Sequence, residues 1–132
     1  MNRILIVDDD ADIRDLLAFA MRRHRYETIV AADGVAALEA VEQVTPDVVL
    51  IDWVMPRMGG LGVCEELRSR ARFDYTGIFL ITANTDAGDQ LLALAAGAND
   101  YICKPFKISD VVARVGTFLT SRSAAAPLIR AS

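Results

Sequence analysis

The sequence predicts an α/β protein, a (βα)5 arrangement in which a doubly wound parallel sheet of five strands carries helices on both faces. Two observations predict this fold class. Five short apolar runs each end close to a polar residue, and between them apolar residues recur every three or four positions. The runs indicate buried strands, the longer period indicates amphipathic helices, and their alternation calls for right-handed crossovers in a parallel sheet. At 132 residues the chain fits one such domain.

The run that ends at Asp52 is the clearest strand. Its four consecutive apolar residues, three of them β-branched, lead directly into the acid, and a Pro/Gly-rich loop follows. A run this short has no helical face of its own, so it is assigned to a strand buried on both sides. Similar runs place the other strands at residues 3–7, 27–32, 78–81 and 101–103.

Helices are expected between these strands. After the first strand, apolar residues recur at i, i+3, i+4, i+7 and i+8, which predicts an amphipathic helix that begins near Asp10. A basic run at residues 22–25 closes it, as the helix dipole favours. The remaining helices are expected after a cap at Asp33, at residues 60–70, from Thr85 or Asp86 to Gly97, and along the apolar stripe at residues 108–119.

Composition and charge narrow the function classes. The formal net charge is −4 and the basic residues are scattered, so no nucleic-acid partner is expected. No apolar run approaches the roughly 18 residues that cross a bilayer, so no membrane partner is expected either. The amino terminus is not that of a secretory signal, and Cys64 and Cys103 lack metal-ligand spacing. These features favour a reducing, cytoplasmic location.

Polar residues follow four of the five predicted strands. Asp8 and Asp9 follow the first strand, Asp52 ends the third, Thr82 follows the fourth and Lys104 the fifth. Because the carboxyl ends of parallel strands meet at one edge, these side chains should gather there. Clustered carboxylates repel one another unless a cation joins them, and an all-oxygen site suits Mg²⁺ or Mn²⁺. A hydroxyl and an ammonium suit phosphoryl oxygens, and a carboxylate can be the nucleophile that forms an acyl phosphate.

Over residues 2–121 the chain resembles the response-regulator receiver domains of two-component signalling, the fold of the chemotaxis regulators. The resemblance implies a flavodoxin-like strand order, 2-1-3-4-5. It is specific because every motif appears, in order, at a strand end. The motifs are Val7-Asp8-Asp9, Asp52-Trp53-Val54-Met55-Pro56-Arg57-Met58-Gly59-Gly60, Thr82-Ala83 and Lys104-Pro105-Phe106.

The resemblance implies a role for each acid. Asp52 would accept the phosphoryl group from a histidine kinase, a histidine phosphotransfer protein or a small phosphodonor. Asp9, aided by Asp8, would hold Mg²⁺ together with Asp52 and the backbone carbonyl of Val54. The residues two past Asp52 and Thr82, which are Val54 and Asn84, would tune how water reaches the acyl phosphate. No enzymatic turnover is expected beyond self-phosphorylation and slow autodephosphorylation.

The same resemblance assigns the switch. Thr82, beside Ala83, would hydrogen-bond a phosphoryl oxygen, and Lys104 would pair with another. The Lys104-Pro105 bond is compatible with the cis form of the family. Tyr101 occupies the aromatic switch position, so the output face would comprise residues 86–96, 101–103 and 108–119. Its ligand would be a downstream protein or a second copy of this chain.

Two other functions compete with this interpretation. In a phosphatase of the haloacid-dehalogenase type, Asp8 and Asp10 would form an Asp-x-Asp signature, but Asp52 would be unexplained and no cap insertion is present. A receiver-like binding module independent of phosphate would be expected to lack an acid, the Thr or the Lys. Periodicity is lost after residue 121, so we expect a receiver domain at residues 1–121 and a tail or linker stump at residues 122–132. Stand-alone and excised forms both stay open.

Overall fold

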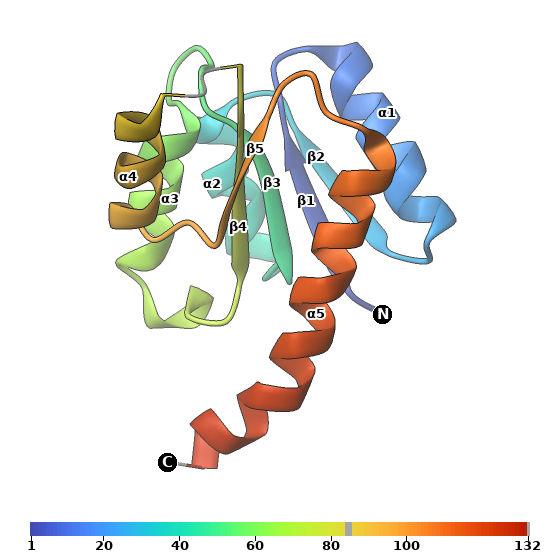
Figure 1. Ribbon diagram of the computed structural model, residues 1–132, viewed down its shortest axis with the longest axis vertical. Coiled ribbons are helices and arrows are strands. Elements are labelled where there is room, and N and C mark those ends of the chain that lie inside the picture. The colour runs from blue at the N-terminus through green and yellow to red at the C-terminus, as the bar shows by residue number, and fades with distance from the viewer. Residues whose placement is uncertain (84–85, 132) are drawn as a thin grey trace.

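A computed structural model describes the backbone of residues 1–83 and 86–131 and the side chains of residues 1–83 and 86–122. Five parallel strands form one sheet in the order β2-β1-β3-β4-β5 (Figure 1), which confirms the predicted fold class and strand order. The strands are β1 (Arg3–Val7), β2 (Glu27–Ala31), β3 (Val48–Asp52), β4 (Gly77–Thr82) and β5 (Asp100–Cys103). The helices are α1 (Ala11–Arg23), α2 (Gly34–Gln43), α3 (Gly60–Arg68), α4 (Ala87–Ala95) and α5 (Ile108–Ala131), with a short 3₁₀ helix, η1 (Ala71–Phe73).

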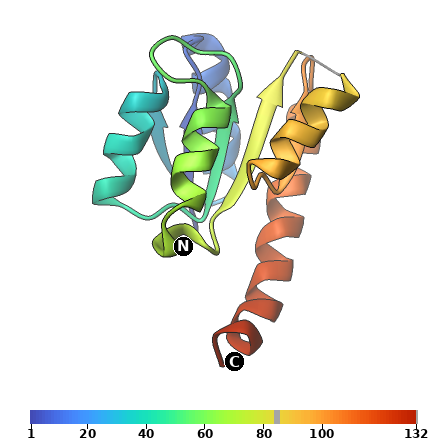
Figure 2. The ribbon, with the colours of Figure 1, turned by 90° about the vertical axis from the view of Figure 1, so that its left-hand side faces the viewer.

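Helices cover both faces of the sheet. α1 and α5 lie on one face, and α2, α3 and α4 lie on the other (Figures 1 and 2). β3 is central and all five of its residues are buried. Successive side chains of a strand point to opposite faces. Val49 and Ile51 therefore join the core under α2 and α3, while Val48 and Leu50 join the core under α1 and α5.

Side-chain caps begin three of the helices where the sequence predicts them. Asp10 accepts from the N–H of Asp12 at 2.9 Å, and Asp33 accepts from the N–H of Ala36 at 2.8 Å. Asp86 accepts from the N–H of Gly88 at 2.8 Å and caps α4. Each carboxylate satisfies an N–H group that lacks a partner within its helix, and its charge suits the positive end of the helix dipole.

The last helix is longer than its apolar stripe. We expected helix α5 to end near Leu119, but its backbone continues to Ala131. Three consecutive alanines follow Ser123, and alanine has the highest intrinsic helix propensity. Among residues 1–83 and 86–131, no helix has both the length and the apolar character needed to cross a bilayer.

Candidate functional site

The carboxyl ends of β1 and β3 bring the acids together. These strands are neighbours and Val7 pairs with Ile51, so Asp8 and Asp52 follow side by side. Carboxylate oxygens of Asp8, Asp9 and Asp52 all lie within 4.8 Å of one another, a group that could hold a metal ion. Asp8 is 2% exposed and Asp52 is 8% exposed, whereas Asp9 faces solvent. The site thus has a buried floor of two carboxylates and an open side.

Lys104 places one cation against this pair of buried acids. Its Nζ lies 3.4 Å from Oδ1 of Asp52 and 3.6 Å from Oδ2 of Asp8. The lysine follows β5, its backbone N–H donates to the carbonyl of Thr82 at 2.7 Å, and the Lys104–Pro105 peptide bond is cis. Both ion-pair distances are longer than those of a charge-assisted hydrogen bond, so the ammonium is shared between the two acids without binding either tightly.

The electrostatics of the pair follow from this burial. Desolvation raises the pKa of Asp52, the charge of Asp8 raises it further, and Lys104 opposes both effects. Desolvation likewise raises the pKa of Asp8, against the N–H of Asp10 and the charge of Lys104. Perturbed carboxyls of this kind cluster at functional sites, because burial and like charges leave them short of a partner.

Asp10 does not complete an Asp-x-Asp pair. Its backbone N–H donates to Oδ1 of Asp8 at 2.9 Å, while its carboxylate caps α1. The carboxylate that the phosphatase hypothesis needs is therefore engaged in the helix cap, and Asp52 occupies the position opposite Asp8 instead.

Thr82 and Tyr101 link this edge to the outer strand. Thr82 ends β4, is 3% exposed and pairs with Cys103 of β5. Burial raises the pKa of Tyr101, and a hydrogen bond between the Tyr101 and Thr82 side chains opposes the rise. The Tyr101 ring also meets Trp53 edge to face, with ring centroids 5.9 Å apart and planes at 86°. The sequence gives no signal for this aromatic contact, because the two residues are far apart in the chain.

The loop after β3 carries the remaining predicted positions. The N–H of Gly60 donates to the carbonyl of Trp53 at 2.9 Å and closes the base of the loop, leaving Val54 75% exposed. Ala83 is exposed at the end of β4, and Asn84 lies outside the described residues. An ion pair between Arg57 and Asp33, at 2.9 Å, joins this loop to α2 and was not predicted.

The sequence of this chain is similar to those of known response regulators. Residues 4–116 match the family described as the response regulator receiver domain. The DNA-binding response regulator MtrA of Mycolicibacterium paratuberculosis is 45% identical over 113 residues, which is 86% of this chain and 49% of that protein. The chain thus spans about half the length of the curated MtrA relatives it matches.

Solved structures of receiver domains have the same fold as this chain. A receiver domain protein (CheY-like) from Methanospirillum hungatei has a TM-score of 0.87 at 27% identity, over 94% of this chain and 98% of that one. The receiver domain of the sensor histidine kinase PA1611 from Pseudomonas aeruginosa has a TM-score of 0.81 at 28% identity, over 90% and 98%. That structure has a magnesium ion coordinated in its active-site cleft.

The relatives overturn one prediction. We expected no nucleic-acid partner, but MtrA proteins that are 43% to 45% identical to this chain are DNA-binding response regulators, so that expectation is wrong. Net charge and scattered basic residues describe only the surface of these 132 residues. They carry no information about the other half of a longer protein, and in the relatives the matched segment is about half.

Proposed function

The chain belongs to the response regulator receiver domain family, a family of signalling domains rather than classical enzymes, and from that premise we propose that it is a switch phosphorylated on Asp52. The observation that carries the proposal is the position of Asp52 at the end of the central strand. There its carboxylate lies among Asp8, Asp9 and the ammonium of Lys104. A buried carboxylate whose negative charge is only partly balanced by nearby cations is suited to accept a phosphoryl group together with a metal cation.

The donor set favours Mg²⁺. Asp9 and Asp52 would hold it, with Asp8 and the backbone carbonyl of Val54 nearby, because hard cations prefer carboxylate and carbonyl oxygens. When bound, the ion supplies positive charge for the oxygens of the transferring phosphoryl group. The magnesium ion in the related receiver of PA1611 supports this choice, and Mn²⁺ offers the same ligand chemistry.

The transfer step needs one nucleophile and charge stabilisation. An oxygen of Asp52 attacks the phosphorus of a phosphohistidine on a histidine kinase or phosphotransfer protein. The P–O bond forms as the P–N bond breaks, and the imidazole nitrogen keeps the electron pair. Lys104 then pairs with one phosphoryl oxygen and the Thr82 hydroxyl donates to another, with Ala83 beside it. Hydrolysis later breaks the bond to Asp52 and releases inorganic phosphate, at a rate that Val54 and Asn84 tune.

The output leaves through the face formed by α4, β5 and α5. A phosphoryl oxygen that draws the Thr82 hydroxyl inward changes the partner of Tyr101, whose side chain is hydrogen-bonded to Thr82. A few kcal/mol of differential contact is enough to move such a two-state population. The face would bind a downstream protein or a second copy of this chain. By analogy with the DNA-binding relatives, we extend the proposal to an output that acts on DNA through a longer protein.

We place the protein in the cytoplasm, where histidine kinases deliver their phosphoryl groups. Cys64 and Cys103 are free thiols, which a reducing compartment preserves. Burial raises the pKa of Cys64 to about 11, so this thiol has little thiolate character at neutral pH.

Phosphorylation of Asp52 can be tested by mass. Incubated with acetyl phosphate and Mg²⁺, the protein should gain one phosphoryl group, and Asp52→Asn should gain none. Asp74→Asn removes an acid from the other end of the sheet and should be phosphorylated as the unchanged chain is. A full mass gain in Asp52→Asn would show that another residue is the acceptor.

A further inference from the structure

The loop between β3 and α3 contains a strained turn. Arg57 has a φ of +69°, and the N–H of Met58 donates to the carbonyl of Pro56 at 2.8 Å across it. This is the rarer form of the γ-turn. Its central residue has backbone dihedral angles that residues with a Cβ seldom adopt. Such a conformation persists only where the surroundings hold it in place.

Asp33, the cap of α2, provides that hold. Nε of Arg57 donates to Oδ2 of Asp33 at 2.9 Å, and Nη2 donates to Oδ1 at 3.1 Å. This two-point geometry fixes the orientation of the guanidinium as well as its position. The Arg57 guanidinium also holds the pKa of Asp33 below its ordinary value. Because the same carboxylate caps α2 through Ala36, the turn is tied to a rigid element.

A backbone hydrogen bond makes a second connection between this loop and α2. The N–H of Gly34, the first residue of α2, donates to the carbonyl of Met58 at 3.1 Å. A Cβ at Gly34 would lie 2.3 Å from that oxygen, so only glycine allows the approach. At the base of the loop, Gly60 donates to Trp53, as described above, and a Cβ at Gly59 would lie 2.5 Å from the Trp53 carbonyl. The segment that carries Val54 is therefore held between two anchors.

We propose that Asp33 and Arg57 are positioning residues of the phosphorylation site: their ion pair holds the loop so that the Val54 carbonyl stays available to the metal beside Asp52. The inference rests on the proposed function. Arg57 is 59% exposed at its side chain, and exposed ion pairs contribute little to overall stability. The expected consequence of its loss is therefore a weaker metal site in a protein that still folds.

Asp33→Asn tests the pair directly, because asparagine is as good a helix cap as aspartate but carries no charge. Titrated with Mg²⁺ and followed by Trp53 fluorescence, this variant and Arg57→Gln should each lose about tenfold in metal affinity, as is usual when an outer residue that orients a metal ligand is removed. The double variant should lose no more than either one, because both act through the same contact. Thermal unfolding should stay close to that of the unchanged chain.

Two further variants separate the mechanism from general electrostatics. Arg57→Gly removes the charge but accepts positive φ without strain, so it should recover part of the affinity that Arg57→Gln loses. Arg70→Gln breaks two surface ion pairs away from the turn, with Glu42 at 2.6 Å and with Glu66 at 2.9 Å, and should leave the Mg²⁺ affinity unchanged.

The outcomes are distinct. Unchanged Mg²⁺ affinity in Asp33→Asn and Arg57→Gln overturns the inference and leaves the proposed function standing. An equal loss in Arg70→Gln also overturns it, because the cause would then be net charge. If the unchanged chain neither binds Mg²⁺ nor takes a phosphoryl group, the proposed function fails and the inference fails with it.

Discussion

Both edges of the sheet carry charges that are buried or partly buried, but only at one edge are these charges fully paired. At the amino edge, Arg68 donates to the carbonyls of Gly97, Phe73 and Thr76 at 2.8, 2.7 and 2.8 Å. It also donates to Oδ1 of Asn99 at 2.7 Å. At the carboxyl edge, Nζ of Lys104 lies no closer than 3.4 Å to an acid.

The difference separates a structural site from a functional one. Folding alone completes the contacts of Arg68, which join α3 to the loops before β4 and β5. The carboxylates of Asp8, Asp9 and Asp52 outnumber the ammonium of Lys104 and leave a need for positive charge that folding does not meet. Sites that are incomplete in the folded protein lower its stability and are retained where binding or chemistry requires them. Substitutions at the two edges should therefore differ in sign.

The largest effect is expected at the amino edge. Arg68→Met keeps much of the length and the apolar stem but removes every donor, which leaves three backbone carbonyls without that partner. We expect the free energy of unfolding to fall by about 1–3 kcal/mol, since partly buried carbonyls that lose their donor are costly defects. Urea denaturation measures the change. Phosphorylation at low temperature should persist, and an unchanged urea midpoint would show that Arg68 is not structural.

At the carboxyl edge the sign should reverse. Asp8→Asn removes one of two adjacent buried charges while it keeps the shape of the side chain. We expect the free energy of unfolding without metal to rise by about 0.5–2 kcal/mol, the usual gain when a functional site is relieved. The added stability that Mg²⁺ gives the unchanged chain should be lost in the same variant. Thermal unfolding with and without Mg²⁺ measures both, and a less stable Asp8→Asn would contradict the comparison.

The pH dependence provides a second measure of this edge. Burial raises the pKa of Asp8 and of Asp52 above the ordinary value of 3.8, so the folded state binds these protons more tightly than the unfolded state. The stability that these two carboxyl groups contribute is complete below pH 3.8 and is lost as pH rises through their raised pKa values. Asp33 has a lowered pKa and acts in the opposite direction. The difference in free energy of unfolding between the unchanged chain and Asp8→Asn isolates the contribution of the carboxyl edge. This difference should widen as pH rises.

Local patterns were enough for the fold and for the acids of the site. The apolar run before Asp52 predicted the limits of β3, because a strand buried on both faces is apolar along its length and ends where the polar residues begin. Asp33 was predicted as a cap for a similar reason, since capping depends on its immediate neighbours. Strand ends in a parallel sheet fix where their side chains meet, so the gathering of Asp8, Asp9 and Asp52 follows from topology.

Contacts between distant segments were not predictable in this way. The partners of Arg68 are mostly backbone carbonyls, which every residue has, so no residue type marks them. Arg57 has an ordinary exposed side chain, and its pairing with Asp33 depends on how one loop folds over the start of α2. The continuation of α5 past Leu119 was not predicted, because the apolar stripe that was used to place this helix ends there.

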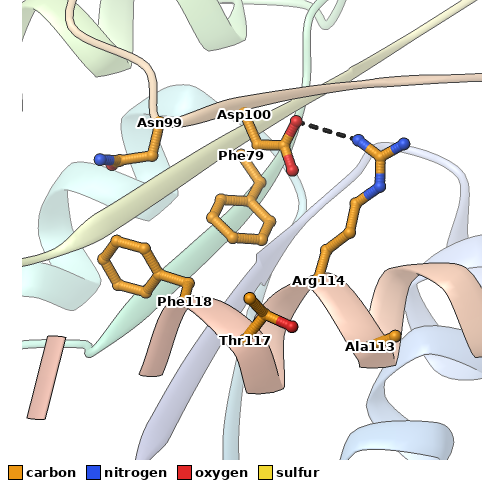
Figure 3. Close-up of a pocket in the computed structure, with 7 residues that line it drawn as sticks. All are labelled: Phe79, Asn99, Asp100, Ala113, Arg114, Thr117 and Phe118. Atoms are coloured by element: carbon orange, nitrogen blue, oxygen red, sulfur yellow. Dashed lines mark hydrogen bonds and ion pairs between the residues drawn. The ribbon is translucent and has the colours of Figure 1, made fainter. Parts of the chain in front are cut away.

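The smallest effect we expect concerns two aromatic pairs. Phe79 of β4 and Phe118 of α5 meet edge to face at 5.8 Å and 87°, and both line a pocket of about 290 Å³ (Figure 3). Trp53 and Tyr101 have nearly the same geometry, at 5.9 Å and 86°, but Tyr101 lies on the face that we propose for the output. Such contacts contribute about 0.5–1.5 kcal/mol beyond burial. The first pair should therefore stabilise the fold, and the second should hold the Tyr101 ring where it lies against Trp53.

Trp53→Leu should consequently shift the resting Tyr101 population away from this position by about two- to thirteenfold, which is the contact energy expressed as an equilibrium. Fluorine NMR of the 3-fluorotyrosine-labelled protein can follow it, because the chain has 3 tyrosines and Tyr101→Phe identifies one signal. Phe118→Leu is the matched control: it should lower stability and leave the Tyr101 signal in place. If Trp53→Leu leaves the signal unmoved, the Trp53 ring does not hold the tyrosine, and the proposed link from the carboxyl edge to the output face would not pass through this aromatic contact.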